Sequence, residues 1–249
     1  MAAETDGGSG AVTAEQAYVE YEGLRLPPPD MTRHGGKTDE DHVRSAKELV
    51  RRAEGLAGMT AGSRVLDVGC GAGRFLIGML ATYGRVERYV GLDVRKPVIE
   101  WASEWLTDPR YGSVSFEWIN VENTRYNRRG TRAGGSHVLP VESGTFDVAV
   151  LFSVFSHMTL EDIETYLHEL RRVLASDGSC YCTVFAEEGV PDWEENPPGY
   201  LREWSGPLHC VRLNKARFEE MLGDAGFGID HFIYRHHQAR QSTYVVSPA

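Results

Sequence analysis

The sequence contains no long run of apolar residues and only four cysteines. No stretch approaches the roughly 20 apolar residues of a transmembrane helix, and Met1 to Gly10 are small and polar, so neither a membrane span nor a secretory signal is expected. Cys70, Cys180, Cys182 and Cys210 lack the Cys-x-x-Cys spacing of zinc sites. We therefore expect isolated thiols in a reducing, cytoplasmic setting.

Positive charge is also scarce. The 249 residues include 26 Lys and Arg against 36 Asp and Glu, giving a formal net charge of −10. Such a chain is repelled by phosphate backbones, so nucleic acid is not an expected partner. Arg125, Arg128, Arg129 and Arg132 form one basic cluster. It is either a solvated loop, which we favour, or a contact for an anionic or hydroxyl-rich substrate.

The first 37 residues are expected to be an N-terminal arm. Residues 1–15 are rich in Gly, Ala, Thr and acidic groups, which is typical of disorder, and Pro27-Pro28-Pro29 requires an extended chain. Gly35-Gly36 would permit a hinge, so whether the arm closes over a site stays open. A helix is predicted at 40–57, capped by Thr38 or Asp39.

Residues 38–249 are predicted to form a single domain in which strands and helices alternate. Strands are predicted at 64–68, 88–94, 114–119, 146–153 and 179–185, and helices at 74–83, 98–106 and 160–174. A helix at 214–225 and a loose antiparallel strand pair, 229–234 and 243–246, follow. This alternation predicts an α/β, doubly wound, mostly parallel sheet. Two long connections, 120–144 and 187–212, interrupt it, and connections of this length are usually functional.

A glycine-rich turn follows the first strand of this region. Asp67-Val68-Gly69-Cys70-Gly71-Ala72-Gly73-Arg74 brings backbone N–H groups against a ligand at a helix N-terminus. A dinucleotide site would need Gly-x-Gly-x-x-Gly, but Arg74 stands where the last glycine belongs. Asp67 would repel a pyrophosphate, whereas it suits a ligand that carries a cationic amino acid.

Asp93 ends the next predicted strand, twenty residues after Gly73. A carboxylate at the tip of the second strand can accept hydrogen bonds from both hydroxyls of a ribose. The alternative is a helix cap before Pro97, and we favour the ribose role.

These motifs resemble those of the class I S-adenosylmethionine-dependent methyltransferases, and the resemblance covers roughly 60–247. Gly144 to Val150 resembles the family's fourth-strand motif, and Leu170 to Ser179 resembles its helix-turn-strand element. The resemblance implies a Rossmann-like sheet of seven strands, with S-adenosylmethionine across the carboxyl ends of the first strands. It places Gly69, Gly71 and Gly73 along the cofactor's amino acid part, Asp67 near the ammonium and Asp93 at the ribose. It also assigns cofactor contacts to Val94, Asn120, Val121 and Phe152, although the family usually has Asp where Asn120 stands.

A weaker resemblance, around Asn123-x-x-Tyr126-Asn127 and Ser153 to Met158, points to bacterial methyltransferases that modify sugars, such as actinobacterial polysaccharide enzymes. We therefore expect an O-methyltransferase for a small hydroxylated acceptor, with a saccharide favoured. Transfer to nitrogen or carbon, and binding of S-adenosylmethionine without catalysis, remain alternatives. A nicotinamide-dependent oxidoreductase is the most distant of these alternatives. We also consider that the protein forms a homodimer.

His157, after the fourth strand, is the candidate general base, because a histidine titrates near neutral pH. The alternative is a local packing or capping role. The candidate acceptor contacts are Tyr126, His137, Trp193, Tyr200, Trp204 and His209. The acidic residues of the second insertion, Glu187, Glu188, Glu194 and Glu195, are the one place for a divalent ion such as Mg²⁺, but their spacing supports none.

Overall fold

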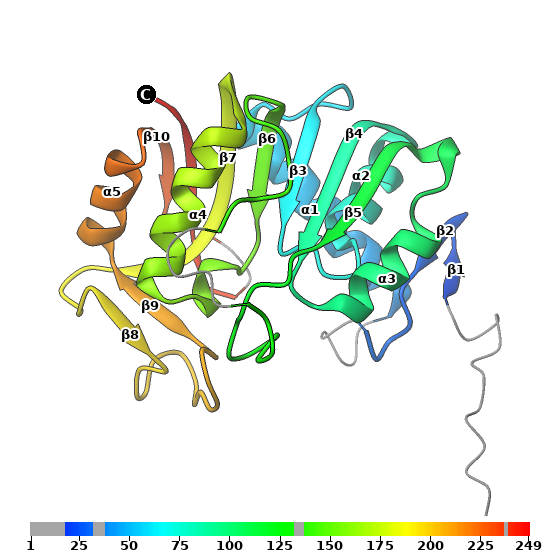
Figure 1. The fold of residues 1–249 in the computed structure, drawn as a ribbon. Coiled ribbons are helices and arrows are strands. Elements are labelled where there is room, and N and C mark those ends of the chain that lie inside the picture. Colours follow the sequence, from blue (N-terminus) through cyan, green and yellow to red (C-terminus); the bar gives the residue numbers. More distant parts are fainter. Residues whose placement is uncertain (1–17, 32–37, 132–136, 237–238) are drawn as a thin grey trace, which may run out of the picture.

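A computed structural model describes residues 18–31, 38–131, 137–236 and 239–249. Its main element is a twisted sheet with helices on both faces (Figure 1). The strands are β1 Val19–Tyr21, β2 Leu24–Leu26, β3 Arg64–Val68, β4 Val86–Asp93, β5 Gly112–Trp118, β6 Phe146–Leu151, β7 Leu174–Glu187, β8 Trp193–Glu195, β9 Val211–Asn214, β10 Phe227–Ile233 and β11 Ser242–Pro248. The α-helices are α1 Asp39–Ala57, α2 Arg74–Tyr83, α3 Lys96–Trp105, α4 Leu160–Val173 and α5 Lys215–Asp224.

The predicted seven-stranded path is confirmed. The strands lie in the order β10-β11-β7-β6-β3-β4-β5, in which β3, β4, β5, β6 and β7 are parallel and β11 is antiparallel to both neighbours. Strand order reverses between β3 and β6, and ligands of such sheets bind outside the carboxyl ends of the strands at this point. The terminal pair is more regular than predicted, because β10 and β11 are paired along their whole length with one bulge.

The two faces of the sheet are covered by different helices, which gives two apolar cores. One core includes apolar side chains of α1, α2 and α3, and the other includes those of α4 and α5. Helix starts follow the predicted caps: the Thr38 and Thr159 hydroxyls each accept the N–H three residues on, and Asp41 and Asp162 complete the capping boxes. Among the helices that the structure describes, none has the length and apolar character that a membrane crossing requires.

Part of the N-terminal arm is more ordered than expected. Strands β1 and β2 form an antiparallel hairpin, with Leu24 and Leu26 buried. The ring of Tyr18 lies 4.7 Å from that of Trp105 on α3, and the Arg25 guanidinium lies over both rings. Residues 19–21 and 24–26 are extended, as expected, but they pair with each other as a hairpin whose contacts with α3 are made by Tyr18 and Arg25. Residues 1–17 and the proposed hinge at Gly35-Gly36 lie outside the described residues.

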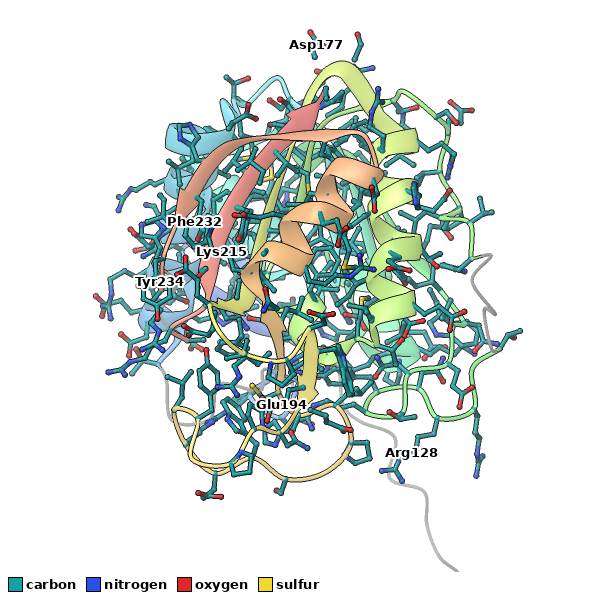
Figure 2. The ribbon with its side chains drawn as sticks, turned by 90° about the vertical axis from the view of Figure 1, so that its left-hand side faces the viewer. Arg128, Asp177, Glu194, Lys215, Phe232 and Tyr234 are labelled. Atoms are coloured by element: carbon teal, nitrogen blue, oxygen red, sulfur yellow. The ribbon has the colours of Figure 1, made fainter. Side chains whose placement is uncertain are left out.

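Both predicted insertions lie at the carboxyl ends of the parallel strands. Figure 2 shows Arg128, in the first insertion, and Glu194, in the second, at the end of the molecule opposite Asp177. The second insertion is not only a loop, since β8 pairs with β9 and β9 continues the sheet in parallel beside the end of β7. The sheet therefore contains nine strands rather than seven. In the first insertion, bridges join Val121 to Thr131 and Asn123 to Asn127.

Candidate active site

The glycine-rich turn leads directly from β3 into α2. Gly69, Gly71 and Gly73 all have left-handed backbones, with φ of 76°, 58° and 76°. A Cβ at Gly69 would lie 2.5 Å from Cγ2 of Val154, and one at Gly73 would lie 2.6 Å from Cδ1 of Leu106. Glycine is favoured at these positions because φ is positive and because neighbouring side chains come too close to leave room for a Cβ.

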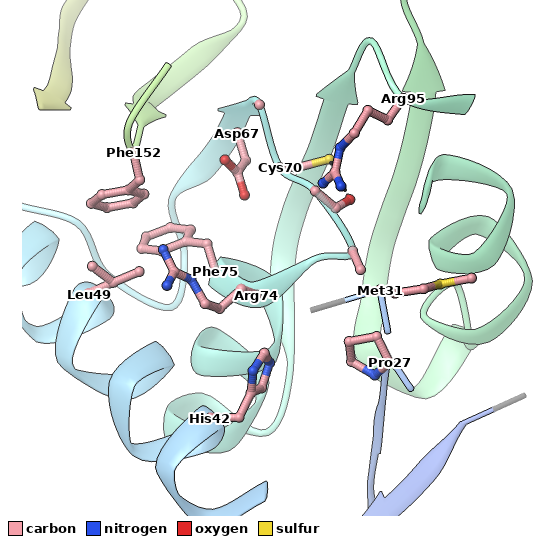
Figure 3. Close-up of a pocket in the computed structure, with 13 residues that line it drawn as sticks. Pro27, Met31, His42, Leu49, Asp67, Cys70, Arg74, Phe75, Arg95 and Phe152 are labelled. Atoms are coloured by element: carbon pink, nitrogen blue, oxygen red, sulfur yellow. Dashed lines mark hydrogen bonds between the residues drawn. The ribbon is translucent and has the colours of Figure 1, made fainter. Parts of the chain in front are cut away.

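A small cavity of about 140 Å³ opens beside this turn (Figure 3). Asp67 lines it and is only 2% exposed, and its carboxylate accepts a hydrogen bond from the Tyr89 hydroxyl at 2.6 Å. Burial raises the pKa of Asp67 to about 7, against the lowering effects of that hydrogen bond and of Arg74. Burial also lowers the pKa of Arg74, which lines the same cavity. A cationic ligand group would stabilise the ionised form of Asp67.

Pro27 and Met31, from the N-terminal arm, also line the small cavity, together with His42 and Leu49 of α1 (Figure 3). The described part of the arm therefore contributes to the wall of the site. The sequence had left open whether the arm takes part.

Asp93, at the end of β4, holds the glycine-rich turn from the opposite side. Its carboxylate accepts hydrogen bonds from the backbone N–H groups of Gly71 and Arg95, both at 2.8 Å. The residue is 6% exposed, and its carboxylate faces the Arg95 guanidinium at 3.5 Å. Each carboxylate oxygen retains acceptor capacity after one N–H bond. Asp93 accepts the N–H of Arg95, which is itself the N-cap residue of α3, and α3 has no side-chain cap, so the structure does not support the helix-cap alternative. Asp93 lines the edge of a cavity instead.

A larger cavity of about 520 Å³ adjoins the small one, and the two share Gly69, Arg74, Arg95 and Phe152 as lining residues. Eight residues predicted as site residues line the larger cavity: Gly69, Asp93, Val94, Tyr126, Phe152, His157, Trp204 and His209. The topology thus brings together residues from the ends of β3, β4 and β6 and from both insertions, at the switch point of the sheet.

Asn120 and Val121 line neither of these cavities. The Asn120 side-chain carbonyl accepts a hydrogen bond from the Asn127 amide at 3.2 Å, and the Val121 backbone carbonyl accepts another at 3.0 Å. Their neighbour Ile119 and the nearby Asn123 line the larger cavity instead. The adenine contact of Asn120 stays a prediction.

His157 ends a short 3-10 helix, Phe155–His157, that follows β6. Its Nδ1 lies 2.8 Å from the carbonyl oxygen of Leu208, which can only accept, so Nδ1 carries the proton of the neutral ring. The basic lone pair then resides on Nε2. The Tyr126 ring meets the imidazole edge to face, with centroids 5.4 Å apart, and the Asn123 amide donates to the His157 carbonyl at 2.9 Å. The first insertion therefore supports the imidazole.

The second insertion divides the predicted acceptor contacts into two groups. Trp204 and His209 line the larger cavity, with ring centroids 5.1 Å apart. Trp193 donates its indole N–H to the Met158 carbonyl at 3.1 Å, and Tyr200 donates its hydroxyl to Glu187 at 2.8 Å. Trp193 and Tyr200 line neither cavity, so their contacts attach the insertion to the domain.

His137 lines neither cavity. Its ring lies 5.9 Å from that of Tyr166 on α4, and burial lowers its pKa. Its Nε2 is buried and has no hydrogen-bond partner among the described residues. Arg132, of the basic cluster, lies outside the described residues.

Sequence reasoning missed a polar network at the larger cavity. Gln241 is 2% exposed, and its carboxamide oxygen accepts hydrogen bonds from the hydroxyls of Thr183 at 2.6 Å and Ser153 at 3.0 Å. Ser153 has φ of 59°, which is uncommon for a residue other than glycine, and its N–H donates to Thr183. A single signal pointed to it: a polar threonine inside the apolar run Cys182 to Phe185.

Three of the four acidic residues considered for a metal are engaged elsewhere. Glu187 binds Tyr200, Tyr234 and Arg235, while Glu194 pairs with Arg212, and Glu195 accepts the Leu208 N–H. In the part of the chain that the structure describes, no three His, Cys, Asp or Glu side chains are grouped so that they could hold a metal ion.

The chain is similar to known proteins in both its sequence and its structure. The sequence model of a family described as a methyltransferase domain matches residues 66–182, which span the glycine-rich turn, Asp93 and β6. Residues 66–182 of the chain are therefore similar to a methyltransferase domain. The strand order agrees with the Rossmann-like α/β methyltransferase fold.

A demethylmenaquinone methyltransferase of Listeria monocytogenes serotype 4a is 25% identical over 209 residues, which cover 77% of this chain and 79% of that protein. The PH0226 protein of Pyrococcus horikoshii OT3 matches with a TM-score of 0.56 at 18% identity, over 89% of this chain and 96% of its own. A 1,6-didemethyltoxoflavin-N1-methyltransferase of Burkholderia thailandensis, bound to its substrate and S-adenosylhomocysteine, matches with a TM-score of 0.54 at 20% identity, over 85% and 80% of the two chains. The two structural matches establish the Rossmann-like methyltransferase fold.

Proposed function

We propose that this methyltransferase is an O-methyltransferase that transfers the methyl group of S-adenosylmethionine to a hydroxyl of a small molecule. The observation that carries the proposal is the place of His157. Its imidazole lines the same cavity as Asp93, Val94 and Phe152, and the bond from Nδ1 to Leu208 leaves the basic lone pair on Nε2. A hydroxyl acceptor needs a base for its proton, and a histidine is suited to that task near neutral pH.

The residues around the glycine-rich turn fit the cofactor's functional groups. Asp67 would hold the ammonium, the turn at Gly69 and Gly71 would follow the amino acid part, and Asp93 would accept hydrogen bonds from the ribose hydroxyls. Arg74 lines both cavities at the start of α2, where a cofactor carboxylate would be stabilised by positive charge. When bound, S-adenosylmethionine supplies a methyl group that is already activated by its sulfonium.

With S-adenosylmethionine bound, the acceptor oxygen would take the methyl group as the carbon–sulfur bond breaks, and the electron pair of that bond would remain on the sulfur of S-adenosylhomocysteine. His157 would take the hydroxyl proton on Nε2. The protein aligns the two reactants in line and excludes water from the cleft. Tyr126 and Leu208 fix the imidazole plane, so the base needs no rearrangement.

The saccharide preference is supported by fewer residues than the sequence suggested. Of the three aromatic residues considered for stacking on a sugar, Trp204 lines the larger cavity, and Trp193 and Tyr200 do not. A saccharide therefore stays one candidate scaffold among small hydroxylated acceptors. The cytoplasmic location and the homodimer also stay predictions.

Transfer to nitrogen is the second candidate, favoured by the toxoflavin N-methyltransferase among the structural relatives. A nitrogen nucleophile with a free lone pair needs alignment more than a base. The deciding experiment measures transfer of radiolabelled methyl from S-adenosylmethionine to paired phenol and aniline acceptors, with the wild type and His157→Ala. We expect phenol methylation that depends on His157; methylation of anilines alone, unchanged by the substitution, would contradict the proposal.

A further inference from the structure

The charge of the site differs in sign from the charge of the chain. The chain carries a formal net charge of −10, yet more basic than acidic side chains line the two cavities. The basic ones are Arg74, Arg95, Arg125 and Arg202, and the acidic ones are Asp67 and Asp93. An excess of positive charge inside a cleft of an acidic protein indicates a negatively charged ligand.

Two of these arginines have acidic neighbours at the glycine-rich turn. Arg95 faces Asp93 at 3.5 Å, and Arg74 interacts electrostatically with Asp67 in the small cavity. Both of these arginines therefore have an acidic neighbour at the cofactor end of the cleft.

Arg125 and Arg202 lie in the larger cavity, and neither forms an ion pair with any described residue. The Nε of Arg125 is buried without a hydrogen-bond partner there, and its guanidinium lies over the ring of Tyr126 at 5.4 Å. The guanidinium of Arg202 lies over the ring of Trp204 at 4.1 Å. An arginine cannot lose its charge near neutral pH, and a buried donor without an acceptor costs free energy. A bound anion would supply the missing acceptor.

The basic cluster found in the sequence divides accordingly. Arg125 turns into the cavity, whereas Arg128 is exposed and donates to the Thr124 carbonyl at 2.9 Å. Figure 2 shows Arg128 at the outer edge of the molecule. The substrate contact and the solvated loop, weighed as alternatives, thus apply to different members of the cluster.

The position of Arg125 relates it to the reaction. Arg125 lies over one side of Tyr126, and Tyr126 meets the imidazole of His157 edge to face. An acceptor anion at Arg125 would therefore be held close to the base. The same positive charge would lower the pKa of a nearby acceptor hydroxyl and ease its deprotonation.

We propose that the methyl acceptor is an anion and that Arg125 and Arg202 bind its negatively charged group, for which a carboxylate serves as the probe. This proposal rests on the proposed function, because it takes the bound anion to be the molecule that receives the methyl group. The anion site itself is tested by binding alone, so the two can fail separately.

The test titrates the full-length protein, saturated with S-adenosylhomocysteine, with two matched pairs of probes. One pair is 3-hydroxy-2-naphthoate and its neutral amide, and the other is the methyl glycoside of glucuronic acid and that of glucose. Each pair differs in the negative charge, and the two pairs separate an aromatic scaffold from a sugar. Calorimetry gives the affinities for the wild type, Arg125→Gln, Arg202→Gln and the control Arg128→Gln, and the affinity for S-adenosylhomocysteine of each variant shows that it is folded.

We expect the anionic member of one pair to bind at least about tenfold more tightly than its neutral partner, as charge-assisted hydrogen bonds to arginine would produce. Arg125→Gln and Arg202→Gln should each reduce that preference severalfold, and Arg128→Gln should retain it. Equal affinity within both pairs, or a preference that survives both cavity substitutions, would overturn the proposal. Arginine-dependent binding of the anion without methyl transfer to it would support the anion site and contradict the proposed O-methyl transfer.

Discussion

The Nδ1 of His157 lies 2.8 Å from the carbonyl oxygen of Leu208, a residue 51 positions later in the chain. This contact ties the segment after β6 to the second insertion. It orients the imidazole through a backbone atom, so the orientation depends on how the insertion is folded and not on the identity of the side chain at position 208.

His157→Ala should reduce methyl transfer to a hydroxyl acceptor by about 10²- to 10⁴-fold, the usual contribution of a general base. Affinity for S-adenosylhomocysteine should stay within about twofold, because the glycine-rich turn and Asp93 are untouched. Steady-state kinetics and calorimetry measure the two effects. His168→Ala, on the exposed face of α4, is the matched control and should change neither. Equal loss of turnover in both variants would contradict a role for His157 as base.

Asp93→Ala should weaken binding of S-adenosylhomocysteine by about 100-fold or more, because the ribose loses its acceptor and the Gly71 N–H loses its partner. Asp93→Asn retains one acceptor oxygen and should lose less. Calorimetry gives the affinities, and circular dichroism checks that both variants are folded. If Asp93→Ala bound S-adenosylhomocysteine as tightly as the wild type does, Asp93 would not be the residue that binds the ribose.

Asp67 should give the unliganded protein a characteristic dependence of stability on pH. The folded-state pKa of about 7 is above the ordinary value near 4, so the protonated carboxyl favours the folded state. This contribution is fully present below about pH 4 and is lost as the pH rises to about 7, at up to about 1.4 kcal/mol per pH unit. Urea unfolding between pH 4.5 and 8 measures it.

Asp67→Asn is the control for that experiment, since its side-chain oxygen still accepts the Tyr89 hydroxyl but does not ionise. Its stability should depend less on pH between 5 and 7 than that of the wild type. Superimposable pH profiles of the two proteins would show that Asp67 does not titrate in this range.

Gly69→Ala should destabilise the protein more than Gly84→Ala. Both positions have a left-handed backbone, with φ of 76° and 77°, so alanine costs about 1–2 kcal/mol at each. At Gly69 the new methyl group would also lie 2.5 Å from Val154, whereas a Cβ at Gly84 meets nothing within 4 Å. We expect an additional loss of about 1–3 kcal/mol at Gly69 from overpacking, measured by urea unfolding. Equal losses would mean that Val154 moves away freely.

The fold and the cofactor side of the site could be predicted because they depend on local signals. Apolar strand runs, capping residues and glycine spacing each act within a few residues, and they located β3, α2, Asp67 and Asp93. The hairpin at residues 19–26 was missed because its stability comes from α3, about 80 residues away. No sequence pattern within the arm indicates that α3 packs against this hairpin.

The acceptor side could be predicted only in part, since tertiary contacts decide which side chains of a long insertion reach the cavity. Trp193 and Trp204 have the same chemistry and similar neighbours in sequence, yet a hydrogen bond to Met158 holds the first against the domain. The place of Gln241 beside Thr183 could not be predicted, because it depends on the pairing of β11 with β7. Arg125 and Arg128 could not be distinguished for the same reason.

The parallel pairing of β9 with the end of β7 has a consequence for how acceptor preference can change. The insertion begins and ends on neighbouring strands, with Phe185 of β7 opposite Arg212 of β9, so its two attachment points are fixed by the sheet. Residues between them can be exchanged or lengthened without displacing the glycine-rich turn on the other side of β6. The insertion could therefore be replaced in order to change which acceptor the protein binds, while the methyl donor site is retained.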